Sequence, residues 1–152
     1  MADISTFRHK KADDSAGFLL WKITALWQRK LAEVLGEFEI TQTQYAMLAS
    51  MKWFEEKNEA TTQTHLVEHT RIDKMTVSKA IRKLEVAGLV VRAQSSIDSR
   101  ATMVRLTIYG KKIILKAIVA IEDADDVFFS GLTGKQLELY KSLTLLVITN
   151  NK

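Results

Sequence analysis

Apolar residues in the first quarter of the chain recur every three or four positions, a spacing that places them along one face of an α-helix. We therefore expect a first helix at about residues 14–35, ended by Gly36, because glycine readily adopts the left-handed backbone of helix stops. Thr41 and Gln44 match a capping box ahead of the next apolar run. They predict a second helix that ends near residues 53–56.

The middle of the chain predicts two helices followed by a hairpin. A short helix at about residues 62–68 leads through a tight connection into a helix that Asp73 can cap and Gly88 can end. Residues 89–92 and 103–106 are short runs rich in valine and leucine, as strands are, and the polar residues between them fit a hairpin tip.

Hydroxyl residues predict where the last two helices begin. Thr107 can cap a long helix over residues 108–129, and a capping box at Thr133 precedes a helix over residues 134–149. The predicted fold class is mainly α with a small β-hairpin. Two helices joined by a short turn and followed by a hairpin, here at residues 61–107, describe a winged helix-turn-helix.

The helix after Asp73 has two contrasting faces. At about 100° per residue, Val77, Ile81 and Leu84 share a narrow arc that should face the core. The opposite side carries cations and, on its flanks, hydroxyls, and such side chains can bond base edges or phosphates when a helix lies in the major groove of DNA. The expected base readers are Thr76, Ser78, Lys79 and Arg82.

The hairpin tip carries a second candidate contact. Arg100 lies where a guanidinium packs against little, and it can enter a narrow minor groove. We expect Asp98 to shape the tip by pairing with Arg92 or with Arg100. Further basic residues are assigned to the phosphate backbone, which positions a protein without specifying sequence: Arg71, Lys74 and Arg105.

The distribution of charge strengthens this reading. The formal net charge of the 152 residues is +4, but residues 71–116 hold eleven basic and three acidic residues and so carry +8. A clustered cation suits a phosphate backbone, because each contact releases condensed counterions, although a solvated basic face is the alternative.

Composition narrows the remaining classes. The chain has no cysteine, which excludes disulfides and thiolate zinc sites, and no apolar run reaches the roughly 18–20 residues of a membrane span. With no signal-peptide pattern either, a cytoplasmic protein is expected. No glycine-rich phosphate loop or nucleophile motif is present, so neither an enzyme nor a cofactor is predicted.

Three stretches resemble the MarR family of bacterial transcription regulators, in order and over nearly the whole chain: residues 40–48, 73–92 and 98–110. The last includes Asp98-Ser-Arg100 and the Leu-Thr-x-x-Gly pattern that ends at Gly110. Ser99 stands where the family usually has a second basic residue.

This resemblance implies a homodimer that binds a double-stranded, pseudo-palindromic operator and usually represses. In this single chain of residues 1–152, residues 40–107 would form the DNA-binding lobe, and residues 12–38 with 108–150 the helical dimerisation region. It also implies release by a small effector, here expected to be aromatic or phenolic, bound between the two parts. The candidate lining residues, for most of which core packing is the alternative, are Trp21, Trp27, Tyr45, Met47, Met51 and Trp53.

Two other functions remain open on the sequence. One is a ligand- or metal-sensing winged helix that acts mainly through a protein partner, and the other is a winged-helix module that binds no specific DNA. His65 and His69 have the four-residue spacing of helical metal ligands, but without cysteine or a nearby set of acids no metal site is predicted.

Overall fold

The computed structural model describes residues 4–152, which form a short 3₁₀ turn, six α-helices and one antiparallel hairpin. This confirms the mainly helical fold with a winged helix. The 3₁₀ turn is η1 (Ala12–Asp14), and the elements after it are α1 (Ala16–Gly36), α2 (Gln42–Glu56), α3 (Gln63–Thr70), α4 (Lys74–Val86), β1 (Val90–Gln94), β2 (Thr102–Leu106), α5 (Ile108–Phe128) and α6 (Gly134–Asn150).

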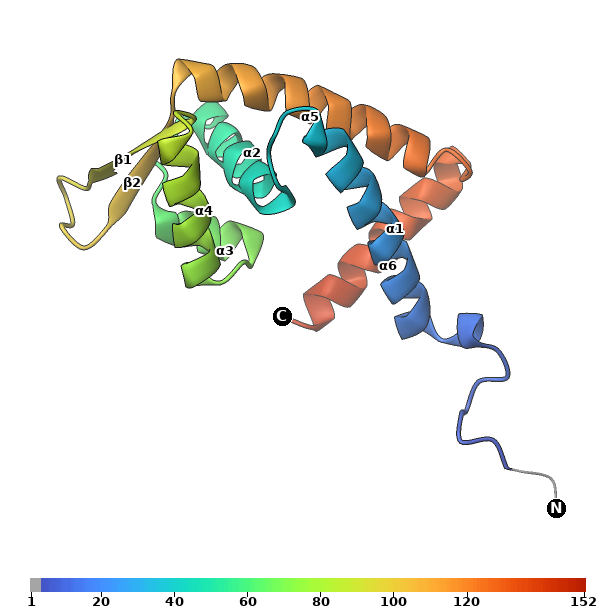
Figure 1. The fold of residues 1–152 in the computed structure, drawn as a ribbon. Coiled ribbons are helices and arrows are strands. Elements are labelled where there is room, and N and C mark those ends of the chain that lie inside the picture. The colour runs from blue at the N-terminus through green and yellow to red at the C-terminus, as the bar shows by residue number, and fades with distance from the viewer. Residues whose placement is uncertain (1–3) are drawn as a thin grey trace.

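Helix α5 spans the molecule and joins its two parts (Figure 1). At its N-terminal end lies a lobe of α2, α3, α4 and the hairpin, and at its C-terminal end lie α1 and α6. Within residues 4–152, no helix is both long enough and apolar enough to cross a membrane.

The hydrophobic core belongs mainly to the lobe. Large side chains of α2, α3 and α4 are fully buried there, among them Leu48, Leu66 and Ile81. Each such burial contributes about 1.5–3 kcal/mol relative to exposure. Ile114 of α5 joins the same core, so the start of α5 is fixed to the lobe, whereas α6 contributes no buried residue.

Local capping explains most helix starts. The side chains of Thr41, Asp73, Thr107 and Thr133 each accept a hydrogen bond from a backbone N–H in the first turn of their helix, as predicted. Ser15 caps α1 in the same way, so α1 begins two residues later than expected.

Other boundaries also differ from the sequence-based expectations by one or two residues, and three of them are informative. Helix α1 includes Gly36, and the left-handed residue that follows it is Glu39 (φ 56°) rather than that glycine. Helix α3 continues to Thr70, whose hydroxyl donates to the carbonyl of Leu66 at 2.7 Å and so supports the last turn. Strand β1 begins at Val90, one residue later than expected, and Val90 pairs with Leu106 of β2.

The hairpin is attached firmly to the start of α5. Thr107 donates its backbone N–H to the carbonyl of Leu89 at 3.0 Å and its hydroxyl to the carbonyl of Gly88 at 2.6 Å. Gly88 has φ 77°, which suits glycine. Position 110 requires glycine, because α5 passes so close to the Leu89 backbone that no side chain fits between them.

Candidate nucleic-acid interface

The outward face of α4 is the centre of the candidate site. Val77, Ile81 and Leu84 are fully buried, whereas Lys79 and Arg82 on the opposite side are exposed. The two-faced helix predicted from the sequence is therefore confirmed. Met75 is 83% exposed beside these cations, and Ser78 is half-buried on the flank.

The cations of α4 have no acidic partners. Among residues 4–152, no carboxylate oxygen lies within 4.0 Å of a side-chain nitrogen of Lys74, Lys79, Arg82 or Lys83, although other lysines and arginines of the chain do form ion pairs. Unpaired, exposed cations on one helix create a positive surface that attracts a polyanion.

Asp73 organises the N-terminus of this helix. Its Oδ1 accepts from the backbone N–H of Thr76 at 2.9 Å, and its Oδ2 accepts from the hydroxyl of Thr76 at 2.6 Å. The hydroxyl and backbone hydrogen bonds from Thr76 hold the pKa of Asp73 below its ordinary value. Arg71, just before, occupies the left-handed region (φ 61°) at the turn between α3 and α4.

The hairpin tip holds Arg100 in an exposed position. Its side chain is 92% exposed, and its Nε lies 3.4 Å from Oδ1 of Asp98, which also accepts from the Arg100 backbone N–H at 3.0 Å. Of the two partners predicted for Asp98, Arg100 is the one the structure contains. Gln94 and Ser99 close the tip, through a 2.6 Å bond from the Gln94 amide to the Ser99 carbonyl.

Arg92, the alternative partner for Asp98, pairs instead with Glu85 of α4. Its guanidinium donates to Oε1 of Glu85 at 3.0 and 3.2 Å, and its backbone N–H donates to Oε2 at 3.2 Å. The bond from the Arg92 side chain is the main reason that the pKa of Glu85 is lowered. Arg92 thus ties the base of the hairpin to the end of α4.

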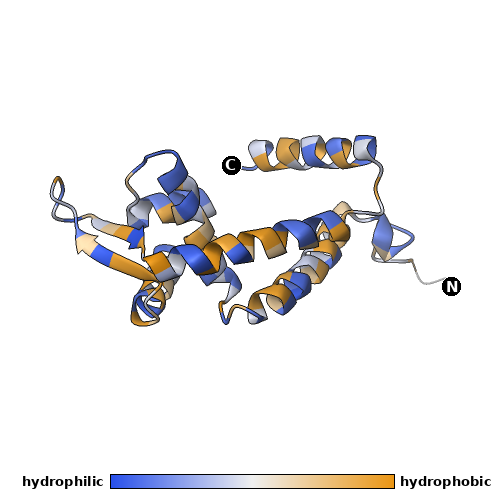
Figure 2. Ribbon diagram, turned by 90° about the horizontal axis from the view of Figure 1, so that it is seen from above, coloured by the Kyte–Doolittle hydropathy of each residue, from blue (hydrophilic) through white to orange (hydrophobic). Residues whose placement is uncertain are grey.

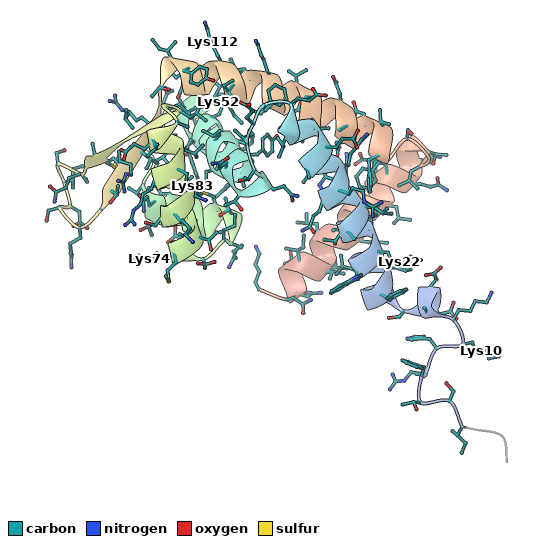
Figure 3. All side chains as sticks on the ribbon, viewed as in Figure 1. Lys10, Lys22, Lys52, Lys74, Lys83 and Lys112 are labelled. Atoms are coloured by element: carbon teal, nitrogen blue, oxygen red, sulfur yellow. The ribbon has the colours of Figure 1, made fainter. Side chains whose placement is uncertain are left out.

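The basic segment of residues 71–116 is not one surface. Lys74 and Lys112 lie on opposite sides of the molecule, Lys112 on the outer edge of α5 (Figure 3). Lys111 is paired with Glu55 of α2 at 3.0 Å. The charge cluster that the sequence suggested therefore divides, and α4 with the hairpin keeps only part of it.

The predicted backbone contacts are all exposed but scattered. Arg71 lies at the turn before α4, Lys74 is the first residue of α4, and Arg105 lies on β2. Arg105 borders a hollow of about 480 Å³ beside Glu55 and Glu59.

The six candidate pocket residues do not share a cavity. Met47 and Met51 belong to the lobe core, while Trp21 and Trp53 are 74% and 53% exposed. Trp53 follows Met51 by two positions, about 200° around the helix, so the two face opposite ways. Tyr45 is half-buried against the core, and burial is the main reason that its pKa is raised.

Of the six, Trp27 lines an aromatic cavity at the other end of the molecule, and Trp21 lines a separate hollow along α1. The cavity beside Trp27 has a volume of about 370 Å³ and lies between α1, the end of α5 and α6. The Trp27 and Phe128 rings are 5.1 Å apart between centroids, and Phe129 and Tyr140 continue the stack at the same spacing.

The two histidines have structural contacts. Nδ1 of His65 accepts from the backbone N–H of Thr62 at 3.3 Å and completes the cap of α3, and the His69 ring lies 5.1 Å from that of Phe54. In the part of the chain that the structure describes, no three histidine, aspartate or glutamate side chains are grouped to hold a metal ion.

Helix α6 stands apart from the rest of the molecule and carries hydrophobic residues along its length (Figure 2). Six of its large apolar side chains are between 53% and 63% exposed: Leu139, Leu143, Leu145, Leu146, Val147 and Ile148. An exposed apolar helix of this size is typical of a surface that another protein chain covers.

Known proteins share both the sequence and the architecture. Residues 36–125 match the family model of the ArnR1-like, winged-helix domain. The HTH-type transcriptional regulator YdcH of Bacillus subtilis is 34% identical over 80% of this chain and 83% of its own length. The HTH-type transcriptional repressor Mb2911 of Mycobacterium bovis is 24% identical over 87% and 93%.

Solved structures with this fold include DNA complexes. The S. aureus MepR–DNA complex matches with a TM-score of 0.82 and 21% identity, over 90% of this chain and 98% of that one. MarR of E. coli in its apo form matches with a TM-score of 0.71 and 22% identity, over 88% and 96%.

Proposed function

This chain belongs to the MarR family of winged-helix transcription regulators, and from that premise we propose that it binds a pseudo-palindromic DNA operator as a homodimer. The observation that carries the proposal is the exposed face of α4, whose cations have no acidic partner in residues 4–152. A helix of this kind fits the major groove, where Lys and Arg donate to guanine.

The division of labour among residues follows from their positions. We assign base reading to Thr76, Ser78, Lys79 and Arg82 on α4, with Arg100 of the tip entering the minor groove. Arg71, Lys74 and Arg105 would hold phosphates. Residues 40–107 would then be the DNA-binding lobe. Because the partner is DNA, the protein would act in the cytoplasm.

Dimerisation would cover the apolar face of α6. In this proposal residues 12–38 and 108–150 of two chains pack together, which removes the exposed leucines of α6 from water. Two-fold symmetry then presents two α4 helices to successive major grooves, about 34 Å apart. The MepR–DNA complex, with a TM-score of 0.82 to this chain, supports such docking.

Repression with release by a small aromatic or phenolic effector completes the proposal. The cavity beside Trp27 supports it, because aromatic rings line it. Its charged lining residues are Asp125 and Lys141, and Lys141 is paired with Glu138 at 3.1 Å. An effector changes DNA binding only if it binds more tightly when the DNA-binding lobes of the two chains have one spacing than when they have another.

The proposal can be tested with one pair of lysines. After in vitro selection of bound DNA, Lys79→Ala should weaken binding to the selected site by about 5- to 150-fold and relax one base position per half-site, as expected for a lost contact to a base. Lys112→Ala removes the same charge from the opposite side of the molecule and should change little.

Salt dependence supplies the second measurement. Affinity should fall by orders of magnitude between about 50 and 200 mM salt if each lobe holds several phosphates. Equal affinities for the two alanine variants together with a flat salt dependence would contradict operator binding. That result would favour the alternative of a sensing module that acts through a protein partner.

A further inference from the structure

The hydrogen bond between the side chains of Asp73 and Thr76 has a definite donor. Oγ1 of Thr76 lies 2.6 Å from Oδ2 of Asp73, a distance that requires one hydrogen between the two oxygens. An ionised carboxylate has no hydrogen to donate, and the pKa of Asp73 is lowered, so the carboxylate is ionised at neutral pH. The hydroxyl of Thr76 is therefore the donor.

This bond leaves the hydroxyl of Thr76 with lone pairs only. Its backbone N–H is also committed to Asp73, at 2.9 Å. Within residues 4–152, no group donates to Oγ1 of Thr76, and the residue is exposed in the first turn of α4. Thr76 thus faces solvent as a hydrogen-bond acceptor that cannot donate without breaking its bond to Asp73.

We propose that Thr76 reads the operator as an acceptor and selects cytosine or adenine, and that Asp73 is the positioning residue that imposes this choice. The inference rests on the proposed function. The first turn of a recognition helix contacts base edges. In the major groove only the amino groups of cytosine and adenine donate hydrogen bonds, whereas guanine and thymine offer acceptors at the equivalent edge.

The same reasoning excludes a phosphate contact for Thr76. Phosphate oxygens only accept, so an acceptor hydroxyl facing one gains nothing. Opposite guanine O6 or thymine O4, the Thr76 oxygen would lose its water without gaining a bond, which is unfavourable. Thr76 therefore contributes to specificity rather than to general affinity.

One substitution should turn the Thr76 hydroxyl from an acceptor into a donor toward the DNA. In Asp73→Asn, the amide oxygen can still accept from the Thr76 N–H, while the amide NH₂ replaces Oδ2 and donates to Oγ1. The Thr76 hydrogen is then released toward the DNA. Asparagine caps helices as well as aspartate does, so α4 should begin at the same residue.

The experiment compares binding to operators that differ by one base pair, by fluorescence anisotropy with purified dimer. Wild type and Thr76→Ser should prefer cytosine or adenine at one position per half-site by about two- to tenfold, the range for one hydrogen bond. Thr76→Val should lose that preference, and Asp73→Asn should shift it toward guanine or thymine.

A charge control is needed because Asp73→Asn also removes a negative charge and should tighten binding to every sequence. Glu68→Gln removes one from an exposed position of α3 and should tighten binding without changing any base preference. Circular dichroism reports whether α4 is retained in each variant.

The outcomes separate the two proposals. A wild-type protein that shows no sequence preference overturns the proposed function and this inference with it. A selective wild type whose ranking of base pairs survives both Asp73→Asn and Thr76→Val overturns the inference alone. If Asp73→Asn disturbs the helix, an unchanged ranking in Thr76→Val is enough to reject it.

Discussion

Replacing Gly110 by alanine tests how tightly α5 is joined to the hairpin. A methyl group there would lie 2.9 Å from the carbonyl carbon of Leu89 and closer still to its oxygen, whereas ordinary contacts lie at 3.4–4 Å. The obstacle is backbone and cannot rotate away. Helix propensity alone predicts the opposite result, because alanine in place of glycine stabilises a helix by about 1 kcal/mol.

The magnitude follows from the contacts at this junction. Forcing extra volume into a packed site costs about 1–3 kcal/mol. Separating α5 from β1 would also stretch the two bonds that Thr107 makes to Leu89 and Gly88, each worth about 1 kcal/mol. After subtracting about 1 kcal/mol of helix propensity, Gly110→Ala should lower the free energy of unfolding by about 2–4 kcal/mol.

Urea unfolding at matched protein concentration measures this difference. The control is Gly17→Ala in the first turn of α1, where the added methyl would meet only Oγ of Ser15 at 4.0 Å. That variant should be as stable as the wild type or up to about 1 kcal/mol more stable. A Gly110→Ala protein as stable as wild type would refute the close approach of α5 to Leu89.

Two further results are expected. The pKa of Glu85 is lowered, so the stability that its carboxylate contributes is present above pH 4.5 and is lost as the pH falls through the lowered pKa. The thermal midpoints of wild type and Glu85→Gln should therefore differ near neutral pH and converge in acid. A difference unchanged down to pH 3 would argue against the pair with Arg92. Leu143→Asp should give a monomer in sedimentation at micromolar concentration, while Ser142→Asp, with the same charge one position along α6, should stay dimeric; a dimeric Leu143→Asp would count against α6 as the interface.

Local chemistry made the helix starts predictable. A cap needs only one side chain and backbone groups two or three residues away, so Thr41, Asp73 and Thr107 are visible in the sequence itself. The buried face of α4 was predictable for a similar reason, because periodicity within one helix fixes which residues share a side.

Contacts between elements were not predictable in this way. The partner of Arg92 is Glu85, seven residues earlier and across the turn at Gly88, whereas the sequence suggested Asp98 of the hairpin tip as one possible partner. The sequence could not separate pocket residues from core residues, because aromatic and methionine side chains serve equally as core, surface and cavity lining. The orientation of α2, which no local pattern reveals, decides among these roles for Met51 and Trp53.

The length and attachment of α5 give the molecule a mechanical property. Its 21 residues form a rod of about 31 Å, clamped at one end to the hairpin through Thr107 and adjoining α6 at the other. A tilt of only about 5° at the α6 end would swing the far end through about 3 Å, the product of angle and length. In a dimer, the same tilt of both α5 helices would double that displacement. The spacing of the two α4 helices would then no longer match the pitch of the double helix.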